Sequence, residues 1–330
     1  MEKVGILAKL PGRGCSRRAL IKGVSNVSIE SNMGGATPAA SEDRIGEYRF
    51  LRMIHPGVNS LIMEVVHESS QRHYAMKQLL ASRGEDPSER KAFEFEAKIG
   101  RELQHPCLLR VHDFVKDPLQ PYFTMDFFPS KHLRLPISAP TKHEMPRTQL
   151  HRIITQVATA LAYMHDLNWI HRDIKPENII FNKSGEAKLI DYAFAMHPIG
   201  GLSKLFGAKP KRQGTPSYMS PEQIRCLSPT PAADIYSFGI TCYEIACGRQ
   251  PFRANSQNEL LKKHIGEKPT PLASFNKDVT PEYADLVMKM IQKKPADRIP
   301  DMHEFLSKFS RMRIFKDDAP PPGFQAGLGM

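Results

Sequence analysis

The sequence predicts an α+β protein with two lobes, a small antiparallel β lobe carrying one helix and a larger, mainly helical lobe. Two observations support this prediction. Short β-prone runs separated by turn residues fill the first part of the domain, and longer stretches with apolar residues at helical spacing fill the remainder. We expect the domain to cover residues 46–310, divided into a small lobe at 46–125 and a large lobe at 126–310.

The strands of the small lobe are expected where β-branched and aromatic residues cluster between turn signals. The first two runs are separated by Pro56-Gly57, and the second and third by the polar stretch Glu68–Arg72, so the first three runs predict a meander. The five expected strands are Tyr48–Ile54, Ser60–Val66, His73–Leu80, Leu108–Phe114 and Tyr122–Phe128.

The helix of the small lobe is expected at Pro87–Leu103. Its residues Ala92, Glu96, Ile99 and Leu103 are spaced to share one face. That face is apolar except for Glu96, so this carboxylate is expected to point toward the interior of the lobe.

Three stretches of the large lobe carry apolar residues at helical spacing, namely Gln149–Asp166, Ala232–Cys247 and Pro281–Gln292. The stretch Ala193–Gln213 contains glycines, prolines and basic residues, and loops of this length are usually functional or disordered. Residues 1–45 lack a sustained period, and residues 311–330 include a Pro-Pro-Pro-Gly run. We therefore expect a flexible tail at each end.

The composition is that of an ordinary globular protein, because 41% of the 330 residues are hydrophobic and 25% are charged. Fibrous and wholly disordered classes are therefore set aside. Lys and Arg outnumber Asp and Glu by 46 to 35, and the net charge of +11 favours anionic partners such as phosphates, nucleic acid or acidic lipid. Solvated surface charge explains the same excess, and the chain has no nucleic-acid recognition motif.

The five cysteines argue for a reducing compartment, because their number is odd and no Cys-x-x-Cys pair occurs among them. A disulfide framework and a zinc site are both disfavoured. The apolar run Val4–Ala8 is too short for a signal-peptide core, and no run approaches the roughly 20 residues of a membrane-spanning helix. The sequence thus predicts a cytoplasmic protein. The cysteines are Cys15, Cys107, Cys226, Cys242 and Cys247.

The strongest chemical motif is the run His171-Arg172-Asp173-Ile174-Lys175-Pro176-Glu177-Asn178. It matches the H-R-D-x-x-x-x-N pattern at every defined position. Phosphoryl transfer needs a carboxylate to orient the acceptor hydroxyl and an amide oxygen to bind a metal ion, and Asp173 and Asn178 supply these groups. A polar turn without catalytic function is the alternative interpretation.

A second carboxylate follows thirteen residues after Asn178, in the run Asp191-Tyr192-Ala193. A carboxylate is a ligand that Mg²⁺ prefers where it bridges phosphate groups, so Asp191 is a candidate metal ligand. Upstream, the run Ala75-Met76-Lys77 lies in the third expected strand. Lys77 is a candidate to grip phosphates with Glu96 as its partner, and we prefer Glu96 to Glu94 because only Glu96 faces the interior.

Two further runs complete a set of motifs in a fixed order. One is Gly214-Thr215-Pro216-Ser217-Tyr218-Met219-Ser220-Pro221-Glu222, and the other is Asp234-Ile235-Tyr236-Ser237-Phe238-Gly239. From Lys77 to Arg298 the order resembles that of the eukaryotic-like (Hanks-type) serine/threonine protein kinases, most closely the bacterial members. The resemblance implies the two-lobed protein kinase fold, in which Asp234 holds the backbone of the catalytic loop and Arg298 pairs with Glu222.

The same resemblance implies an ATP-dependent enzyme that phosphorylates serine or threonine in protein substrates and can phosphorylate itself. ATP and Mg²⁺, or Mn²⁺ in its place, are the implied cofactors. Lys175 matches the serine/threonine pattern, because tyrosine kinases usually lack a lysine at this position. The implied catalytic residues are Asp173, Lys175, Lys77 and Glu96, the metal ligands are Asn178 and Asp191, and the ATP-binding residues are Gly57, Ile62, Ala75, Lys77, Met125, Asp126, Phe128 and Ile180.

The sequence departs from the family pattern at three places. The glycine-rich loop reads His55-Pro56-Gly57-Val58-Asn59-Ser60, so only its middle glycine is kept and nucleotide affinity is expected to fall. Ala193 replaces a glycine that gives the metal-binding segment its mobility. Gly100 stands where the family has a large apolar residue, and this is expected to loosen the active arrangement.

These departures motivate an alternative, a pseudokinase that binds nucleotide and partners without transferring phosphate. The complete set of catalytic residues argues against it. A small-molecule phosphotransferase of the same fold is a second alternative, disfavoured by the Ser-Pro-Glu segment and the Asp234 motif. The sequence indicates neither the physiological substrate nor the oligomeric state.

Regulation is expected through Arg172, which in the family often needs an anionic partner from the activation segment, here the residues between Asp191 and Glu222. Ser203 and Ser217 are the expected phosphorylation sites, whereas Thr215 is expected to contact Asp173 and Lys175. Two further acids, Glu177 and Glu244, match positions that read a basic substrate residue in some family members. They are alternatively committed to internal pairs, with Lys209, Lys211 or Arg212 as the candidate partners.

Overall fold

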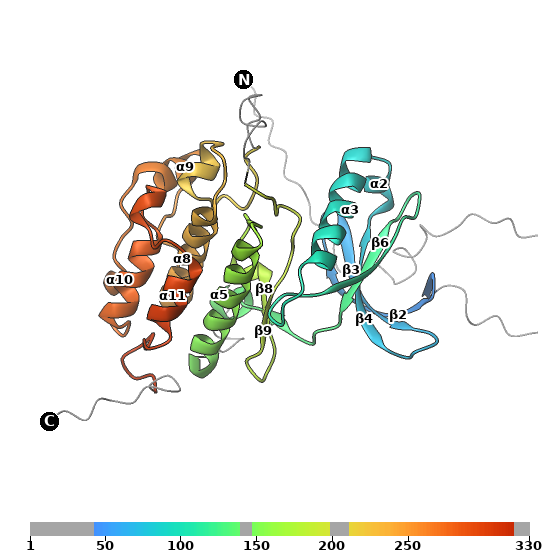
Figure 1. The fold of residues 1–330 in the computed structure, drawn as a ribbon, viewed down its shortest axis with the longest axis horizontal. Helices are drawn as coiled ribbons and strands as arrows, with labels where there is room; N and C mark the ends of the chain where they lie inside the picture. Colours follow the sequence, from blue (N-terminus) through green and yellow to red (C-terminus); the bar gives the residue numbers. More distant parts are fainter. Residues whose placement is uncertain (1–42, 139–146, 199–210, 320–330) are drawn as a thin grey trace, which may run out of the picture.

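The computed structural model describes residues 43–138, 147–198 and 211–319, and the statements below refer to these residues. They form two lobes that lie side by side, a β-rich lobe and a mainly helical lobe (Figure 1). The two expected lobes of the α+β fold are thus present.

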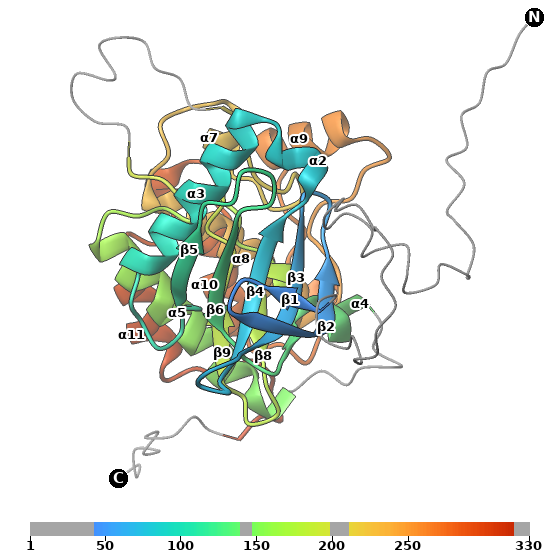
Figure 2. The same ribbon diagram turned by 90° about the vertical axis from the view of Figure 1, so that its right-hand side faces the viewer.

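The small lobe is built on a six-stranded antiparallel sheet with the order β1-β2-β3-β4-β6-β5 (Figure 2). All five expected strands are found, and β1 precedes them as an edge strand formed by two residues that we expected in the tail. The strands are β1 (Arg44–Ile45), β2 (Tyr48–Pro56), β3 (Ser60–His67), β4 (His73–Leu79), β5 (Val111–Val115) and β6 (Tyr122–Asp126).

The main helix of the small lobe, α3 (Pro87–Glu102), begins where Asp86 accepts a hydrogen bond from the backbone N–H of Ser88. Its buried residues are Phe93, Glu96, Ala97, Ile99 and Gly100. Ala92, which we expected on the inner face, is exposed. The inner face is instead centred on Phe93, Glu96 and Gly100. The expected position of Glu96 is therefore correct, whereas the expected position of Ala92 is wrong. A short helix, α2 (Ala81–Gly84), precedes α3.

The large lobe is mainly helical, with a three-stranded sheet of order β7-β8-β9 on the side of the small lobe (Figure 1). Helix α8 lies at its centre, because every residue from 233 to 246 is buried. The elements are β7 (Lys131–His132), α4 (Arg134–Ser138), α5 (Leu150–Asp166), β8 (Ile179–Phe181), β9 (Ala187–Leu189), α7 (Pro221–Ile224), α8 (Pro231–Cys247), α9 (Gln257–Gly266), α10 (Pro281–Met290) and α11 (Met302–Phe309), with 3-10 turns at Arg147–Gln149, Pro176–Asn178, Leu272–Ser274 and Pro295–Asp297.

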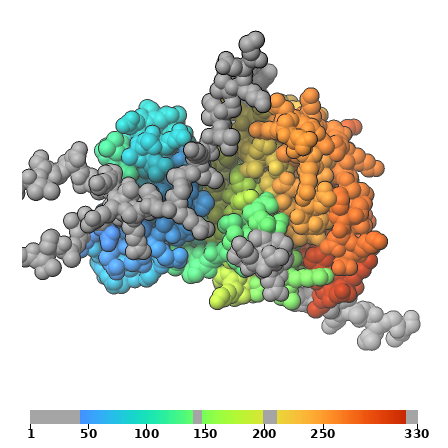
Figure 3. Space-filling model, turned by 180° about the vertical axis from the view of Figure 1, so that it is seen from behind, coloured from blue at the N-terminus to red at the C-terminus, as the bar shows by residue number. Residues whose placement is uncertain are grey.

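The core of the large lobe extends into the small lobe, since Ile99 and Leu103 at the end of α3 belong to the same buried cluster as α5 and α8. A second connection is made by backbone hydrogen bonds of Leu189, which donates to Cys107 and accepts from Leu109. Seen from behind, the small lobe is blue to cyan, and the large lobe runs from green through yellow and orange to red (Figure 3). The end of α3 and the segment Cys107–Leu109 therefore join the small lobe to the core of the large lobe.

Residues 311–319, which we expected in a C-terminal tail, pack against the large lobe. Ile314 and Phe315 are buried, and Phe315 forms an isolated bridge with Val279. The guanidinium of Arg147 lies 4.2 Å from the centre of the Phe315 ring. The remaining expected tail residues, 1–42 and 320–330, lie outside the described residues. In the described residues, no helix is long and apolar enough to span a bilayer.

Candidate active site

The carboxylate of Asp173 is the best-connected acid of the site. The backbone N–H and the hydroxyl of Thr215 each donate to its Oδ1 at 2.8 Å. Lys175 Nζ donates to Oδ2 at 2.6 Å and to the Thr215 hydroxyl at 2.8 Å. Thr215 thus contacts both Asp173 and Lys175, as we expected. The chain brings a carboxylate, an ammonium group and a hydroxyl together within one hydrogen-bonded cluster.

The backbone that carries Asp173 is held in an unusual conformation by a buried acid. Arg172 has a φ of +70°, a left-handed value that non-glycine residues rarely adopt. Asp234, at the start of α8, accepts hydrogen bonds at 2.8 Å from the N–H groups of His171 and Arg172. Burial opposes ionisation of Asp234, but hydrogen bonding and charge from His165 outweigh it and hold its pKa below the ordinary value. The carboxylate therefore stays charged and fixes the loop.

Glycine is required at position 214, where the activation segment passes close to the catalytic loop, His171–Asn178. Gly214 has a φ of +113°, and a Cβ atom there would lie 2.8 Å from the carbonyl oxygen of Arg172. The close approach allows Thr215 to reach Asp173.

Lys77 and Glu96 form the ion pair that we expected between β4 and α3. Lys77 Nζ donates to both carboxylate oxygens of Glu96, at 2.6 and 2.8 Å. Burial lowers the pKa of Lys77, but the negative charges of Glu96 and Asp191 outweigh burial and hold the pKa above its ordinary value. Lys77 is therefore charged and faces both acids.

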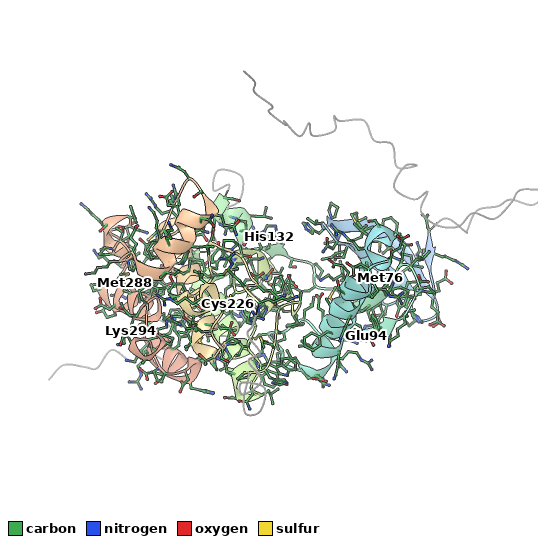
Figure 4. All side chains as sticks on the ribbon, turned by 90° about the horizontal axis from the view of Figure 1, so that it is seen from above. Met76, Glu94, His132, Cys226, Met288 and Lys294 are labelled. Atoms are coloured by element: carbon green, nitrogen blue, oxygen red, sulfur yellow. The ribbon has the colours of Figure 1, made fainter. Side chains whose placement is uncertain are left out.

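Glu94 takes no part in this pair. It is exposed and forms an ion pair with Lys116 at 2.5 Å, on the outer side of α3 (Figure 4). The choice between the two glutamates from helix geometry is therefore correct.

Asp191 and Asn178 provide oxygen atoms that suit a divalent cation. Burial raises the pKa of Asp191, but Lys77 and His171 outweigh it, so the pKa lies below the ordinary value and the group is anionic. Asn178 donates its amide N–H to Asp173, at 2.8 Å to the carbonyl and 3.2 Å to the carboxylate. Its amide oxygen accepts no hydrogen bond from the described residues. In the described residues no three His, Cys, Asp or Glu side chains form a metal cluster. Carboxylate and amide oxygens are ligand types that Mg²⁺ takes together with phosphate oxygens and water.

Tyr192 fills the space left by Gly100. Its ring is buried, and its hydroxyl donates to the carbonyl oxygens of Leu109 at 3.2 Å and Leu189 at 3.4 Å. A Cβ atom at position 100 would lie 3.3 Å from the Tyr192 ring and 2.3 Å from the Val111 side chain. Our expectation that Gly100 loosens the arrangement is therefore wrong, because a larger aromatic residue and Val111 occupy the volume.

The turn around Gly57 joins β2 to β3 and is tight. Gly57 N–H donates to the carbonyl oxygen of Ser60 at 2.9 Å, and a Cβ atom at position 57 would lie 2.7 Å from that oxygen. The loop is also tied to the rest of the lobe, because Asn59 accepts from the N–H of Leu80 at 2.9 Å and donates to Glu89 of α3 at 3.3 Å. Glycine is thus required here by the turn itself, and Val58 at its tip is 85% exposed.

The residues expected around the adenine lie on both lobes and on the segment between them. Ile62 is on β3 and pairs with Lys77 across the sheet, and Ala75 is buried on β4. Met125 and Asp126 end β6, and Ile180 is half-buried on β8. Phe128 follows β6, and its N–H donates no hydrogen bond to a described residue. These residues flank the connection between the lobes.

The end of the activation segment is anchored in the large lobe. Arg298 donates to both oxygens of Glu222, at 2.6 and 2.9 Å, and both side chains are buried. Ser220 and Gln223 form a capping box at the start of α7. The pairing of Arg298 with Glu222 is the one that the motif order implied.

Arg172 is buried and surrounded by neutral acceptors. Its guanidinium donates to the carbonyl oxygens of Lys211 at 3.0 Å and Phe194 at 3.4 Å, and to the side chain of Gln213 at 3.3 Å. Its Nε has no hydrogen-bond partner among the described residues, and burial lowers its pKa. No carboxylate of the described residues bonds to this guanidinium. Of the two expected phosphorylation sites, Ser217 is half-buried and Ser203 lies outside the described residues.

Glu177 and Glu244 share a partner that sequence reasoning missed. Arg134, the first residue of α4, donates to Glu177 at 2.7 Å and to both oxygens of Glu244 at 2.8 and 3.1 Å. The internal pairing that we considered is thus present. The candidate partners were wrong for the described residues, because neither Lys211 nor Arg212 bonds to these acids, and Lys209 lies outside the described part. No spacing in the sequence links Arg134 to them.

Comparison with protein families identifies a match to the protein kinase domain over residues 48–309. The serine/threonine-protein kinase PknA of Mycobacterium tuberculosis is 28% identical over 295 residues, which cover 84% of this chain and 65% of PknA. The serine/threonine-protein kinase PksC of Streptomyces coelicolor is 27% identical over 86% of this chain and 52% of its own length. Aurora kinase A-A of Xenopus laevis is 30% identical over 76% of this chain and 59% of its own length. The matched part is thus between about half and two thirds of each relative.

Proposed function

The chain belongs to the protein kinase family, and from this premise we propose that it transfers the γ-phosphate of ATP to serine or threonine hydroxyls of proteins, its own among them. Members of the family use ATP and a divalent metal. The proposal includes Mg²⁺ as that metal, with Mn²⁺ as a substitute, because two oxygen ligands and no soft donor are offered by Asp191 and Asn178.

One observation carries the proposal, namely the cluster of Asp173, Lys175 and Thr215. A hydroxyl that approaches Asp173 meets a carboxylate positioned by four hydrogen bonds, from both donors of Thr215, from Lys175 and from Asn178. Asp173 would orient that hydroxyl and accept its proton as the phosphoryl group transfers. Lys175 lies beside the reacting oxygen and would neutralise charge on the transferring group.

The phosphates would be held by Lys77, which Glu96 keeps in position, and by the backbone of the turn at Gly57. The divalent cation would neutralise phosphate charge between Asp191 and Asn178. The adenine would lie between Ile62, Ala75 and Ile180, against the backbone of Asp126 and Phe128 and next to Met125. The N–H of Phe128 supports this arrangement, because it donates to no described residue and is available as a donor to the base.

Further parts of the proposal concern the whole chain. We propose that the catalytic domain extends over residues 46–310, with lobes at 46–125 and 126–310. Protein substrates are the proposed partners, and nucleic acid is not. A cytoplasmic location is supported by the odd number of cysteines, and the thiols of the described residues, Cys107, Cys226, Cys242 and Cys247, are all free.

Regulation by phosphorylation of the activation segment is also proposed. Arg172 supports it, because its guanidinium has neutral partners and a buried Nε without a partner among the described residues. A phosphate on Ser203 or Ser217 would supply an anion for this group and for Lys211 and Arg212 beside it.

The test is transfer of radiolabelled phosphate from ATP to three peptides that differ only in the acceptor, serine, threonine or tyrosine. We expect incorporation into the serine and threonine peptides that depends on added Mg²⁺. Absence of transfer to all three, together with saturable ATP binding, would favour the pseudokinase. Preferential transfer to tyrosine would contradict the proposed substrate class.

A further inference from the structure

Glu64 of β3 is a buried carboxylate that the proposed mechanism does not use. The residue is 6% exposed. Its Oε2 accepts a hydrogen bond from Arg52 Nε at 2.6 Å, and its Oε1 lies 2.8 Å from His73 Nδ1. Arg52 comes from β2 and His73 from β4, so the carboxylate joins side chains of three neighbouring strands. A buried charge is costly without such partners, so the three side chains, which we call the Glu64 cluster, are held together.

The Glu64 cluster lies on the face of the sheet that carries proposed adenine-binding residues. Glu64 pairs across the sheet with Arg52 of β2 on one side and with Ala75 of β4 on the other. Cross-strand partners share a face, and so do residues two positions apart in one strand. Ile62 therefore lies on the same face as Glu64, and Ala75 on the same face as His73. The cluster thus borders the part of the sheet that would cover the base.

The Glu64 cluster also contacts the segment that connects the two lobes. Phe127 lies in the middle of the run 126–128, whose backbone is proposed to face the adenine. The ring centres of His73 and Phe127 are 5.9 Å apart, and the guanidinium carbon of Arg52 lies 6.0 Å from the centre of the Phe127 ring. Contacts of an aromatic ring with a second ring or with a cation at these distances are attractive. Both partners of Glu64 therefore hold the connecting segment against the sheet.

We propose that Glu64 is a positioning residue for the adenine. Through Arg52 and His73 it fixes the distance between the sheet and the connecting segment, the two walls between which the base would lie. The inference rests on the proposed function, because it concerns the proposed ATP site. A pocket whose walls are already held in place loses less conformational freedom when its ligand binds. Glu64 therefore acts on nucleotide affinity and not on the transfer step.

Calorimetric titration with adenosine tests this role, because adenosine carries the base and the ribose without the phosphates. Glu64→Gln removes the charge with almost no change in volume, so Arg52 and His73 are no longer both held by a carboxylate. We expect this variant to bind adenosine about fivefold more weakly than the wild type, the size expected when a charge-assisted hydrogen bond is lost. In initial-rate assays the KM for ATP should rise by about the same factor, with kcat within about twofold of the wild type.

Two further variants separate this role from a general loss of stability. Glu68→Gln makes the same substitution in the same lobe and breaks an ion pair of 2.7 Å with Arg44, outside the Glu64 cluster. This variant should bind adenosine as the wild type does. Phe127→Leu removes the ring that the cluster contacts. In a Phe127→Leu background, Glu64→Gln should weaken adenosine binding by less than about twofold, because the contact through which Glu64 acts is already lost.

If Glu64→Gln does not fold, Arg52→Gln replaces it. The side chain of Arg52 is 62% exposed, and its loss leaves Glu64 paired with His73. We then expect adenosine to bind about threefold more weakly than to the wild type, since one of the two partners still holds the ring.

Adenosine binding keeps this inference distinct from the proposed function. Weaker binding of adenosine to Glu64→Gln, without transfer of phosphate by any variant, would support the role of Glu64 and contradict the proposed function. Phosphate transfer with wild-type affinity for adenosine in a folded Glu64→Gln, or in Arg52→Gln where it replaces that variant, would overturn the inference and leave the proposed function in place. An equal loss of affinity with and without the Phe127 ring would also overturn it.

Discussion

The ring of Tyr192 lies against Gly100, so that the small residue at position 100 is matched by a large one in the run Asp191-Tyr192-Ala193. A Cβ atom at position 100 would lie 3.3 Å from the ring and 2.3 Å from the Val111 side chain. Helix α3 carries Gly100 one turn after Glu96, and Tyr192 directly follows Asp191. The pair therefore connects the position of the Lys77–Glu96 ion pair to the metal-binding segment.

Gly100→Leu is predicted to be harmful although it restores the kind of residue that the family has at this position. A leucine must displace Val111 or Tyr192, and overpacking of this kind costs about 1–3 kcal/mol of unfolding free energy. The shift of α3 should separate Lys77 from Glu96 and lower kcat/KM at least about tenfold.

The matched control for this prediction is Gly266→Leu, since a Cβ atom at position 266 meets nothing within 4 Å. Chemical denaturation and initial rates of both variants give the comparison. A Gly100→Leu enzyme with wild-type stability and rate would show that the contact between residues 100 and 192 is unimportant.

Ser60→Gly is predicted to tighten ATP binding or to raise activity, by a modest factor of about two to five. The hydroxyl of Ser60 makes no hydrogen bond to the described residues, so its removal leaves no polar group unpaired. Loss of the side chain allows closer approach of backbone N–H groups to phosphate. Calorimetric titration with ATP provides the measurement. An unchanged or weaker affinity, with no gain in activity, would argue that the turn at Gly57 does not cover the phosphates.

Gln213→Glu is predicted to replace part of the effect of activation-segment phosphorylation. The Gln213 side chain lies 3.3 Å from the Arg172 guanidinium, so a carboxylate there would give Arg172 an anionic partner. A charge-assisted bond is stronger than a neutral one by about 1 kcal/mol, or about fivefold in rate if it acts on the active conformation.

Phosphatase-treated wild type and Gln213→Glu are compared in initial-rate assays, with Gln213→Glu in an Arg172→Gln background as the control. We expect a gain only where Arg172 is present. Phosphopeptide mapping after incubation with Mg-ATP, with Ser203→Ala and Ser217→Ala, shows which residue is modified. Full activity without any activation-segment phosphate, and no gain in Gln213→Glu, would contradict regulation at this site.

Stability is predicted to fall in acid through His264, a buried residue of α9 whose Nδ1 lies 2.9 Å from the hydroxyl of Tyr236 on α8. Burial, with the positive charge of Lys293 adding to it, lowers the pKa of His264 to about 3. The unfolded chain binds a proton at this residue below about pH 6.5, whereas the folded chain does so only near pH 3. The free energy of unfolding contributed by His264 is therefore lower by about 2 kcal/mol at pH 5 than at pH 7.5.

Urea titrations of the wild type and His264→Gln at these two pH values measure this contribution. The variant loses ring contacts and is less stable at both values, but its pH dependence should be smaller by about 2 kcal/mol. His55→Gln, at an exposed histidine, is the control and should keep the wild-type dependence. Equal pH dependence in the wild type and His264→Gln would contradict the account.

Much of the fold and of the site follows from local pattern, and the exceptions have a common cause. Glu96 can be identified because one charge interrupts an apolar helical face. Asp173, Asn178 and Asp191 can be identified because the order and spacing of their motifs match those of the protein kinase family. Arg134 could not be identified in this way, because its partners Glu177 and Glu244 lie 43 and 110 residues away. Contacts of this kind depend on how α4 packs, which no local pattern encodes.

The interpretation of Gly100 failed for a related reason. The space beside Gly100 is filled by the side chains of Val111 and Tyr192. Neither residue belongs to the helix that carries Gly100, so the sequence of the helix alone does not show that this space is occupied. The position of Ile314 and Phe315 was missed because a short apolar pair without a period gives no signal of packing.

The central claim is that Asp173 acts on the hydroxyl and Asp191 on the metal and phosphates, and the pair Asp173→Asn and Asp191→Asn tests it most directly. Each change removes one charge with almost no change in volume, so the fold should be retained. Both variants should transfer phosphate at least about a hundredfold more slowly than the wild type. Calorimetry should separate them, with Asp173→Asn binding ATP with the Mg²⁺ dependence of the wild type and Asp191→Asn losing that dependence. Wild-type turnover in either variant, or a loss of Mg²⁺ dependence in Asp173→Asn but not in Asp191→Asn, would contradict the account.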